Sequence, residues 1–212
     1  MTATVPADPR TARFSLILPA TWVVLDLDPR TRDRSIQRMI RTAVGTSDRL
    51  AQFRRSAVQL YRTMLSDAAD AGAFFAATYS QTIEGRPLAA SALAFLGRLP
   101  PGADDEPITI EEMITTLSEP GPGESVEELP ATIDLEVGQA VRIRGRTGVG
   151  MTGSDGSEPM VDVTRFFVPV PPWDLMLVMA FSTRILPVGE AFAELFDQLA
   201  RTARWESERW QS

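Results

Sequence analysis

The sequence predicts an α+β fold in which consecutive antiparallel strands form a sheet and the helices are set apart from them along the chain. Two observations support this prediction. Short apolar runs bounded by proline or glycine occur in neighbouring pairs, as the strands of hairpins do. Apolar residues at spacings of three and four indicate amphipathic helices, one group after the first strands and one closing the chain. No repeat or clear linker interrupts the pattern, so we expect a single domain over residues 1–212.

The first two expected strands lie near the N-terminus. Residues 14–18 form an apolar run that ends at Pro19, and residues 22–27 form a second run directly after the turn. Residues 1–13 carry two prolines and lack the apolar core of a secretory signal. We expect this segment to be a flexible N-terminal arm.

Two helices are expected in the segment that follows, at 31–44 and 48–71. Gly45 ends the first pattern, and the Thr46-Ser47-Asp48 run after it is typical of a new N-cap. A single bent helix is the alternative. The second helix carries an apolar stripe on one side, formed by Leu50, Phe53, Ala57, Leu60, Met64 and Ala68.

The rest of the chain divides into strands, a short helix, a loop and a closing helix. Thr109 and Glu112 have the spacing of a capping box, which predicts a short helix there. Residues 118–130 hold three prolines and two glycines and are expected to form a loop. We expect strands at 73–81, 87–96, 160–168 and 173–182, and a last helix after Pro187.

One further pair of strands is expected to place opposite charges across from each other. Apolar and charged residues alternate on both sides of Gly138-Gln139-Ala140. If these three residues form the turn, Glu136 lies opposite Arg142 and Asp134 lies opposite Arg144, with apolar residues paired on the other face. A two-residue turn would place Glu136 opposite a valine and mix the two faces. The pattern therefore favours the three-residue turn.

Four residue types are absent from the chain: histidine, cysteine, lysine and asparagine. Their absence removes the imidazole, thiolate and amine groups that often act as bases or nucleophiles, and it leaves no histidine or cysteine to hold zinc. A GC-rich genome explains the loss of lysine and asparagine, whose codons are rich in A. We therefore expect a non-catalytic interaction, scaffold or chaperone-like domain with no metal or cofactor. The alternative is a hydrolase that works with two carboxylates.

Charge and hydropathy indicate the surroundings of the protein. A net charge of −7 argues against nucleic acid as the main ligand. The absence of cysteine rules out a disulfide framework. The longest apolar run, at 175–181, is far shorter than the roughly 20 residues of a membrane helix. We expect a cytoplasmic protein that binds another protein and no membrane.

A basic segment supplies the first candidate interaction residues. Between Pro29 and Arg62, nine arginines and two aspartates leave a local balance of +7. Such a surface binds phosphates or an acidic protein face, and Arg54, Arg55 and Arg62 are its candidate contacts. The alternative is a solvated helix face without a ligand.

An acidic segment follows the basic one. Between Leu99 and Val141, eleven acidic residues occur without a single arginine. The two segments are opposite in charge, so they can meet within one molecule or across a homodimer. The carboxylates at 104–106 and 111–112 suit a hard cation, but the glycine and ligand alternation of a calcium loop is missing. We therefore expect no metal site.

Two tryptophans near the C-terminus are the aromatic candidates for a binding surface. Trp205 and Trp210 are the first and last residues of the run Trp-Glu-Ser-Glu-Arg-Trp. Tryptophan is enriched at the energetic centres of protein interfaces. The alternative places Trp205 over the core and Trp210 on a frayed tail at 206–212.

Both ends of the chain and one central strand carry a distinctive order of motifs. An opening strand ends at a proline ahead of a tryptophan, and a last strand leads through a threonine-containing turn into the closing helix. The residues concerned are Phe14–Pro19, Trp22, Gly138–Ile143, Asp174–Thr183, Phe192, Phe196-Asp197, Leu199-Ala200 and Thr202. Their order resembles that of PsbP-like domains, and the likeness spans about residues 14–205.

The resemblance implies an antiparallel sheet sandwiched between helices and a role in binding. Members include a photosystem subunit, a protein that binds the GTPase Ran, and bacterial lipoproteins or effector chaperones, and they share no catalytic motif. The chain departs from the exported members because it has no signal and no lipid-anchor cysteine. Its arginine-rich segment at 30–62 also goes beyond the family pattern.

Overall fold

The computed structural model describes residues 2–8, 12–83, 86–100, 102, 108–119, 124–148, 160–170 and 175–207. Its helices are α1 (Pro29–Val44), α2 (Ala51–Asp70), α3 (Ile110–Leu117) and α4 (Gly189–Arg201). Its strands are β1 (Thr2–Asp8), β2 (Ala12–Ile17), β3 (Trp22–Val24), β4 (Ala73–Ile83), β5 (Arg86–Arg98), β6 (Glu124–Leu135), β7 (Gly138–Gly148), β8 (Met160–Val170), β9 (Leu175–Thr183) and β10 (Arg204–Ser207). Short 3-10 turns at Asp48–Leu50 and Leu186–Val188 precede α2 and α4.

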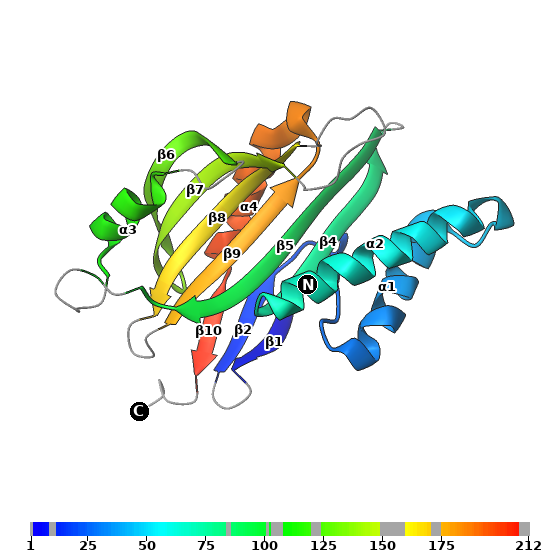
Figure 1. The fold of residues 1–212 in the computed structure, drawn as a ribbon, viewed down its shortest axis with the longest axis horizontal. Helices are drawn as coiled ribbons and strands as arrows, with labels where there is room; N and C mark the ends of the chain where they lie inside the picture. Colours follow the sequence, from blue (N-terminus) through cyan, green and yellow to red (C-terminus); the bar gives the residue numbers. More distant parts are fainter. Residues whose placement is uncertain are drawn as a thin grey trace.

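The strands form two sheets, with the helices alongside (Figure 1). The large sheet has seven strands in the order β3-β4-β5-β9-β8-β7-β6, and the small sheet has three in the order β1-β2-β10. Neighbouring strands pair antiparallel in both sheets. The predicted α+β class is confirmed.

One face of the large sheet packs against the small sheet and α4, which passes behind the large sheet in Figure 1. Phe14 of β2 meets Phe75 of β4 edge-on, with ring centres 5.6 Å apart. Phe196 of α4 stacks on Phe181 of β9 at 5.2 Å. All four rings are buried, and the burial of such large apolar groups is the main source of stability in this layer.

The opposite face of the large sheet is covered in two separate places. The α1–α2 hairpin covers the β3–β4 side, where Ile36 and Leu65 pack with Ala76 of β4. The short helix α3 covers the β7 side, where Met113 packs with Val141. Figure 1 shows β5, β9 and β8 between these two covers. Residues of these central strands that point to this face are therefore only half-buried.

Local capping residues set the ends of the helices. Asp28 caps α1 by accepting a hydrogen bond from the backbone N–H of Arg30. Gly45 ends α1 with a φ of 75°, a conformation that favours glycine. Thr109 and Glu112 form a reciprocal capping box at the start of α3. The predicted boundaries at Gly45 and at the capping box are confirmed.

Some segments expected to be irregular are strands at sheet edges. Part of the expected arm at 1–13 is β1, which pairs with β2, and the expected loop at 118–130 contains the start of β6. The first two residues of the expected tail at 206–212 belong to β10, and the remainder lies outside the described residues. The expected arm and loop were wrong for residues 2–8 and 124–130, because edge strands tolerate proline and charge. Pro130 lies within a register shift of β6.

The predicted pairing of Glu136 with Arg142 and of Asp134 with Arg144 is wrong. The turn between β6 and β7 has two residues rather than three, and this difference shifts every pair. Arg142 lies opposite Ala131, and Asp134 lies opposite a glutamine whose side chain donates a hydrogen bond to it. Glu136 instead forms an ion pair with an arginine of β10.

Arg142 and Arg144 of β7 face α4 rather than solvent. Arg142 and Arg144 bind the Asp197 carboxylate of α4 at 2.6 and 3.0 Å, and both also bind Glu128 of β6, at 3.2 and 3.0 Å. Burial lowers the pKa of Arg144, but the adjacent carboxylates more than offset this effect and raise it above its ordinary value. The predicted register assumed one solvated face, whereas both faces of β7 are covered.

Removal of Asp197 is expected to destabilise the fold strongly, because it leaves Arg142 and Arg144 partly buried without their main counter-charge. We expect Asp197→Ala to lower the free energy of unfolding by about 3–5 kcal/mol, measured by urea denaturation. Asp134→Ala removes an exposed carboxylate from β6 and should change the free energy of unfolding by less than about 0.5 kcal/mol. Similar effects of the two substitutions would contradict a buried charge cluster.

Candidate functional site

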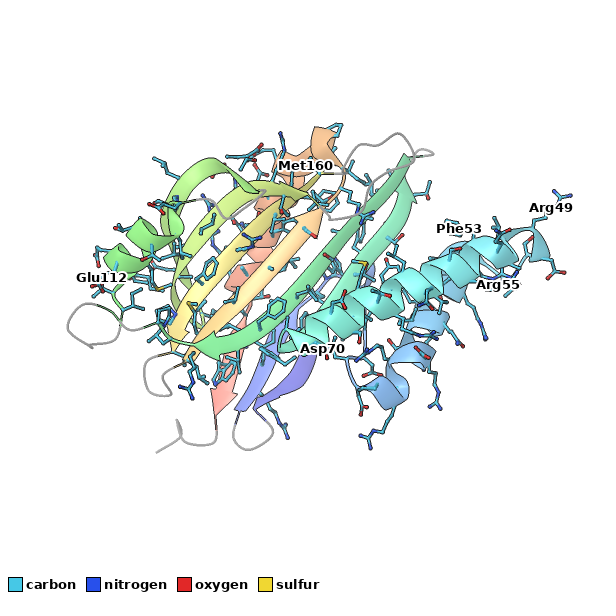
Figure 2. All side chains as sticks on the ribbon, viewed as in Figure 1. Arg49, Phe53, Arg55, Asp70, Glu112 and Met160 are labelled. Carbon is cyan, nitrogen blue, oxygen red and sulfur yellow. The ribbon has the colours of Figure 1, made fainter. Side chains whose placement is uncertain are left out.

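The basic segment folds into a helical hairpin that extends beyond the large sheet. Figure 2 shows Arg49 at the far tip of this hairpin and Asp70 at the end of α2 that meets the sheet. The buried residues of α2 are Leu65 and Ala68, both in its C-terminal half. The N-terminal half of α2 packs on α1 but has no sheet beneath it, so much of its surface meets solvent.

Two of the three predicted interaction arginines hold the hairpin together. Arg54 donates hydrogen bonds to the carbonyl oxygens of Gly45 and Ser47 at 3.2 and 2.7 Å, which ties α2 to the turn after α1. Arg62 of α2 forms a bidentate pair with Asp33 of α1, with both contacts at 2.8 Å. The hydrogen bond from Arg62 lowers the pKa of Asp33. These two arginines therefore have structural partners.

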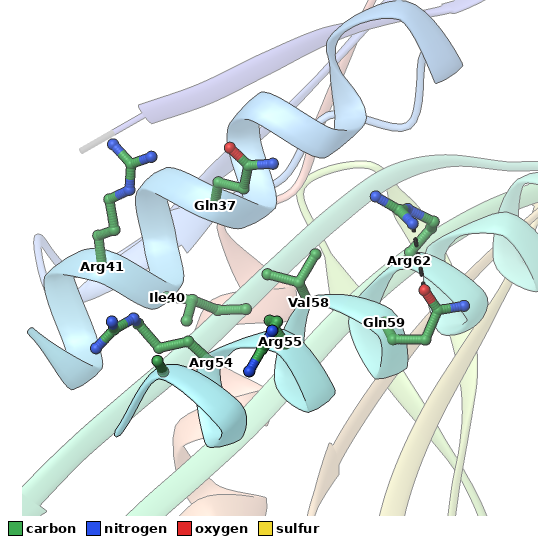
Figure 3. Close-up of a pocket in the computed structure, with 9 residues that line it drawn as sticks. Gln37, Ile40, Arg41, Arg54, Arg55, Val58, Gln59 and Arg62 are labelled. Atoms are coloured by element: carbon green, nitrogen blue, oxygen red, sulfur yellow. Dashed lines mark hydrogen bonds between the residues drawn. The ribbon is translucent and has the colours of Figure 1, made fainter. Parts of the chain in front are cut away.

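A groove of about 710 Å³ runs between α1 and α2 (Figure 3). Ile40 of α1 and Val58 of α2 point toward each other between the helices. Arg41 and Arg55 also line the groove, and within the described chain neither forms an ion pair. Of the three predicted arginines, Arg55 is thus the one whose guanidinium has no hydrogen-bond or ion-pair partner within the described chain, and the described lining contains no carboxylate.

A line of apolar side chains runs along another side of α2. Phe53, Leu60 and Met64 lie seven and four residues apart, which places them on one side of the helix. Phe53 is 60% exposed and Met64 is 43% exposed, and Leu50 before the helix is 41% exposed. Figure 2 shows Phe53 and Arg55 on opposite sides of α2. We call Leu50, Phe53, Leu60 and Met64 the apolar line.

The apolar line overlaps the stripe that the sequence predicts, but much of it lies outside the core. Ala57 and Ala68 pack as part of the core, together with Leu65, which the predicted stripe did not include. Phe53 and Met64 are uncovered. Helical periodicity identifies the apolar side of a helix but carries no information on how far the sheet extends beneath it.

The structure places Trp205 against the core. It lies opposite Phe14 in β10 and meets the ring of Phe74 edge-on, with centres 6.4 Å apart. This position matches the alternative reading, in which the residue covers the core. Trp210 lies outside the described residues. Trp205 therefore does not contribute to the candidate site on the hairpin.

The acidic segment meets other arginines than those of the hairpin. Glu127 binds Arg146, Glu128 binds two further arginines of β7, and Glu136 binds Arg204. In Figure 1, α3 lies at the opposite end of the large sheet from α1 and α2. Residues 104–106 lie outside the described chain, and within it no group of three or more ligating side chains is placed to hold a metal ion.

No protein-family model matches the chain, and no curated protein sequence matches it. Among the residues that the structure describes, no helix has both the length and the apolar character needed to cross a membrane.

The cap that starts the hairpin is expected to titrate at low pH. Hydrogen bonds from the side chain and backbone of Arg30 lower the pKa of Asp28 from 3.8 to about 2. Since the folded state favours the ionised form, the cap contributes its full stability above the unfolded value of about 3.8 and loses it as pH falls through about 2. A carboxyl NMR titration measures this pKa directly.

The Arg30→Gln substitution provides the control for this titration. It should raise the pKa of Asp28 toward 3.8, because the side-chain hydrogen bond is the largest cause of the shift. The Arg34→Gln substitution removes an exposed arginine of the same helix and should leave the pKa unchanged. Equal responses to both substitutions would show a general charge effect rather than a specific cap.

Proposed function

We propose that the chain is a non-catalytic protein-interaction module of the scaffold or chaperone kind, and that the α1–α2 hairpin is its docking element. The exposure of Phe53, at 60%, is the observation that carries this proposal. Large apolar side chains gathered on one exposed surface favour contact with a partner, since burial gains about 25 cal/mol per Å² of apolar area. An aromatic residue is a common anchor of such contacts.

The charge of the hairpin supports an acidic surface on the partner. Arg41, Arg49 and Arg55 are exposed, and within the described chain none of them forms an ion pair. Arg55 lies on the opposite side of α2 from Phe53, so these charges attract an acidic partner toward the hairpin, while the apolar line supplies the contact surface. Complementary charge accelerates association and orients the two surfaces.

Two further proposals accompany the interaction role. The order of strands and the closing helix α4, on a sheet with helices on both faces, support a PsbP-like relationship. The absence of cysteine supports the cytoplasm as the place where the protein acts. The carboxylate-dependent hydrolase receives no such support, because Glu128 and Asp197 are held by two arginines.

A pair of surface substitutions tests the docking role. Tagged wild-type protein, Phe53→Ser and Leu129→Ser are each used to capture proteins from a lysate of the source organism, with quantification by mass spectrometry. Leu129 is 83% exposed on β6, far from the hairpin, and serves as the matched apolar control. We expect a partner that wild type and Leu129→Ser retain and that Phe53→Ser loses by about tenfold or more.

The thermal midpoints of the three proteins separate binding from folding. The side chains of Phe53 and Leu129 are both exposed, so both variants should unfold near the wild-type temperature. A partner lost from Leu129→Ser instead of Phe53→Ser would place the contact at the β6 edge and contradict docking on the hairpin. Recovery of the bait alone from all three would contradict the interaction role itself.

A further inference from the structure

A cavity of about 270 Å³ lies between α2 and the large sheet. Leu60, Tyr61, Met64 and Leu65 of α2 form one wall, and residues of β4, β5, β8 and β9, with Leu25 and Arg184, form the rest of its lining. It is separate from the groove between α1 and α2, with which it shares no lining residue. It lies at the part of the sheet that the hairpin and α3 leave incompletely covered.

Two serines place polar hydroxyl groups in the lining of this cavity. Ser91 of β5 and Ser182 of β9 lie directly opposite each other, and their hydroxyl oxygens are 2.7 Å apart. Both residues are half-buried and line the cavity. Each hydroxyl carries one hydrogen, and the bond between them uses only one of the two. Whichever serine donates, the pair therefore retains one O–H that is available to an acceptor.

The neighbouring threonines offer no such hydrogen. The Thr78 hydroxyl donates to the carbonyl oxygen of Ala90 at 3.2 Å, and the Thr183 hydroxyl donates to that of Ala89 at 2.8 Å. Both threonines line the same cavity, but their hydrogens bind the backbone of β5. Among these four hydroxyl groups, the free hydrogen-bond donor therefore belongs to the serine pair.

The remaining walls are apolar, apart from the phenol of Tyr61 and a cation. Leu93 and Val161 of the sheet line the cavity together with Leu60 and Met64 of α2. Met64 is 43% exposed, so a flexible thioether side chain lies where the cavity meets solvent. Arg184 also lines the cavity, is exposed, and within the described chain has no ion pair.

We infer that this cavity binds a small apolar molecule that carries one carboxylate. The apolar body would displace water from the aliphatic walls, the carboxylate would accept the hydrogen of the serine pair, and Arg184 would attract its negative charge. Drug-sized ligands occupy cavities of about 300–1,000 Å³, so a volume of about 270 Å³ suits a smaller molecule. The cavity shares Leu60 and Met64 with the apolar line, but the inference does not rest on the proposed docking role, because its test needs no protein partner.

Three probes with the same eight-carbon chain test the inference: octanoate, octanol and octylammonium. Octanoate and octylammonium are added below their micelle-forming concentrations, and octanol below its solubility limit, to the full chain labelled with ¹³C at the methionine methyl groups. Met64 lines the cavity, whereas Met160 is a similarly exposed methionine at the start of β8 that does not line it. We expect a saturable shift of the Met64 methyl alone, with octanoate binding about tenfold or more tightly than octylammonium.

Matched serine substitutions show whether the cavity is responsible. Ser91→Leu fills it and should abolish the Met64 shift, whereas Ser80→Leu changes an exposed serine of β4 outside the cavity and should preserve it. If Ser91→Leu does not fold, the double variant Ser91→Ala and Ser182→Ala keeps the space and removes the donor. It should weaken octanoate binding by about tenfold.

Three results would overturn the inference. The first is the absence of a saturable Met64 shift with all three probes. The second is an equal shift of Met160, which indicates nonspecific adsorption of the alkyl chain. The third is equal affinity for octanoate and octylammonium, because neither the serine donor nor Arg184 would then recognise the ligand.

Discussion

The arrangement of this protein depends on how unequally the two faces of the seven-stranded sheet are covered. On one face, the small sheet and α4 join Phe14, Phe166 and Phe196 in a single apolar cluster. On the other, the cover is divided between α3 and the α1–α2 hairpin, each with its own smaller cluster. An antiparallel sheet tolerates partial exposure of one face. The position of the hairpin, its uncovered apolar line and the cavity beneath α2 all follow from this division.

The same division determines which charged side chains are paired and which remain exposed. Because α4 covers one face of β7, Arg142 and Arg144 of that strand require counter-charges, which the buried Asp197 and the partly exposed Glu128 supply. Glu127 and Glu136 of the acidic segment are likewise bound by Arg146 and Arg204. These carboxylates are therefore not available to the hairpin, where Asp33 is bound by Arg62 and several arginines remain exposed. A chain with a net charge of −7 thus presents a basic surface at one end.

Local signals in the sequence predicted local structure, whereas properties that depend on distant packing were not predictable. Gly45 and the capping box at Thr109 act through bonds within a few residues, so the helix ends they predict are confirmed. The register of β6 on β7 depends on α4, which binds Arg142 through a residue 55 positions away. The exposure of Phe53 depends on where the sheet ends beneath α2, which periodicity does not encode. The cavity was not predictable from the sequence either, because Ser91 and Ser182 are brought together only by the pairing of β5 with β9.

The central claim is that a protein partner covers the apolar line of α2. Site-specific photocrosslinking tests it most directly, with benzoylphenylalanine placed at position 53 or at position 129 of the protein expressed in cells of its source organism. Both positions carry exposed large apolar residues, Phe53 and Leu129. We expect a discrete higher-mass adduct from position 53 and none from position 129. No adduct at position 53, or the same adduct from both positions, would contradict it.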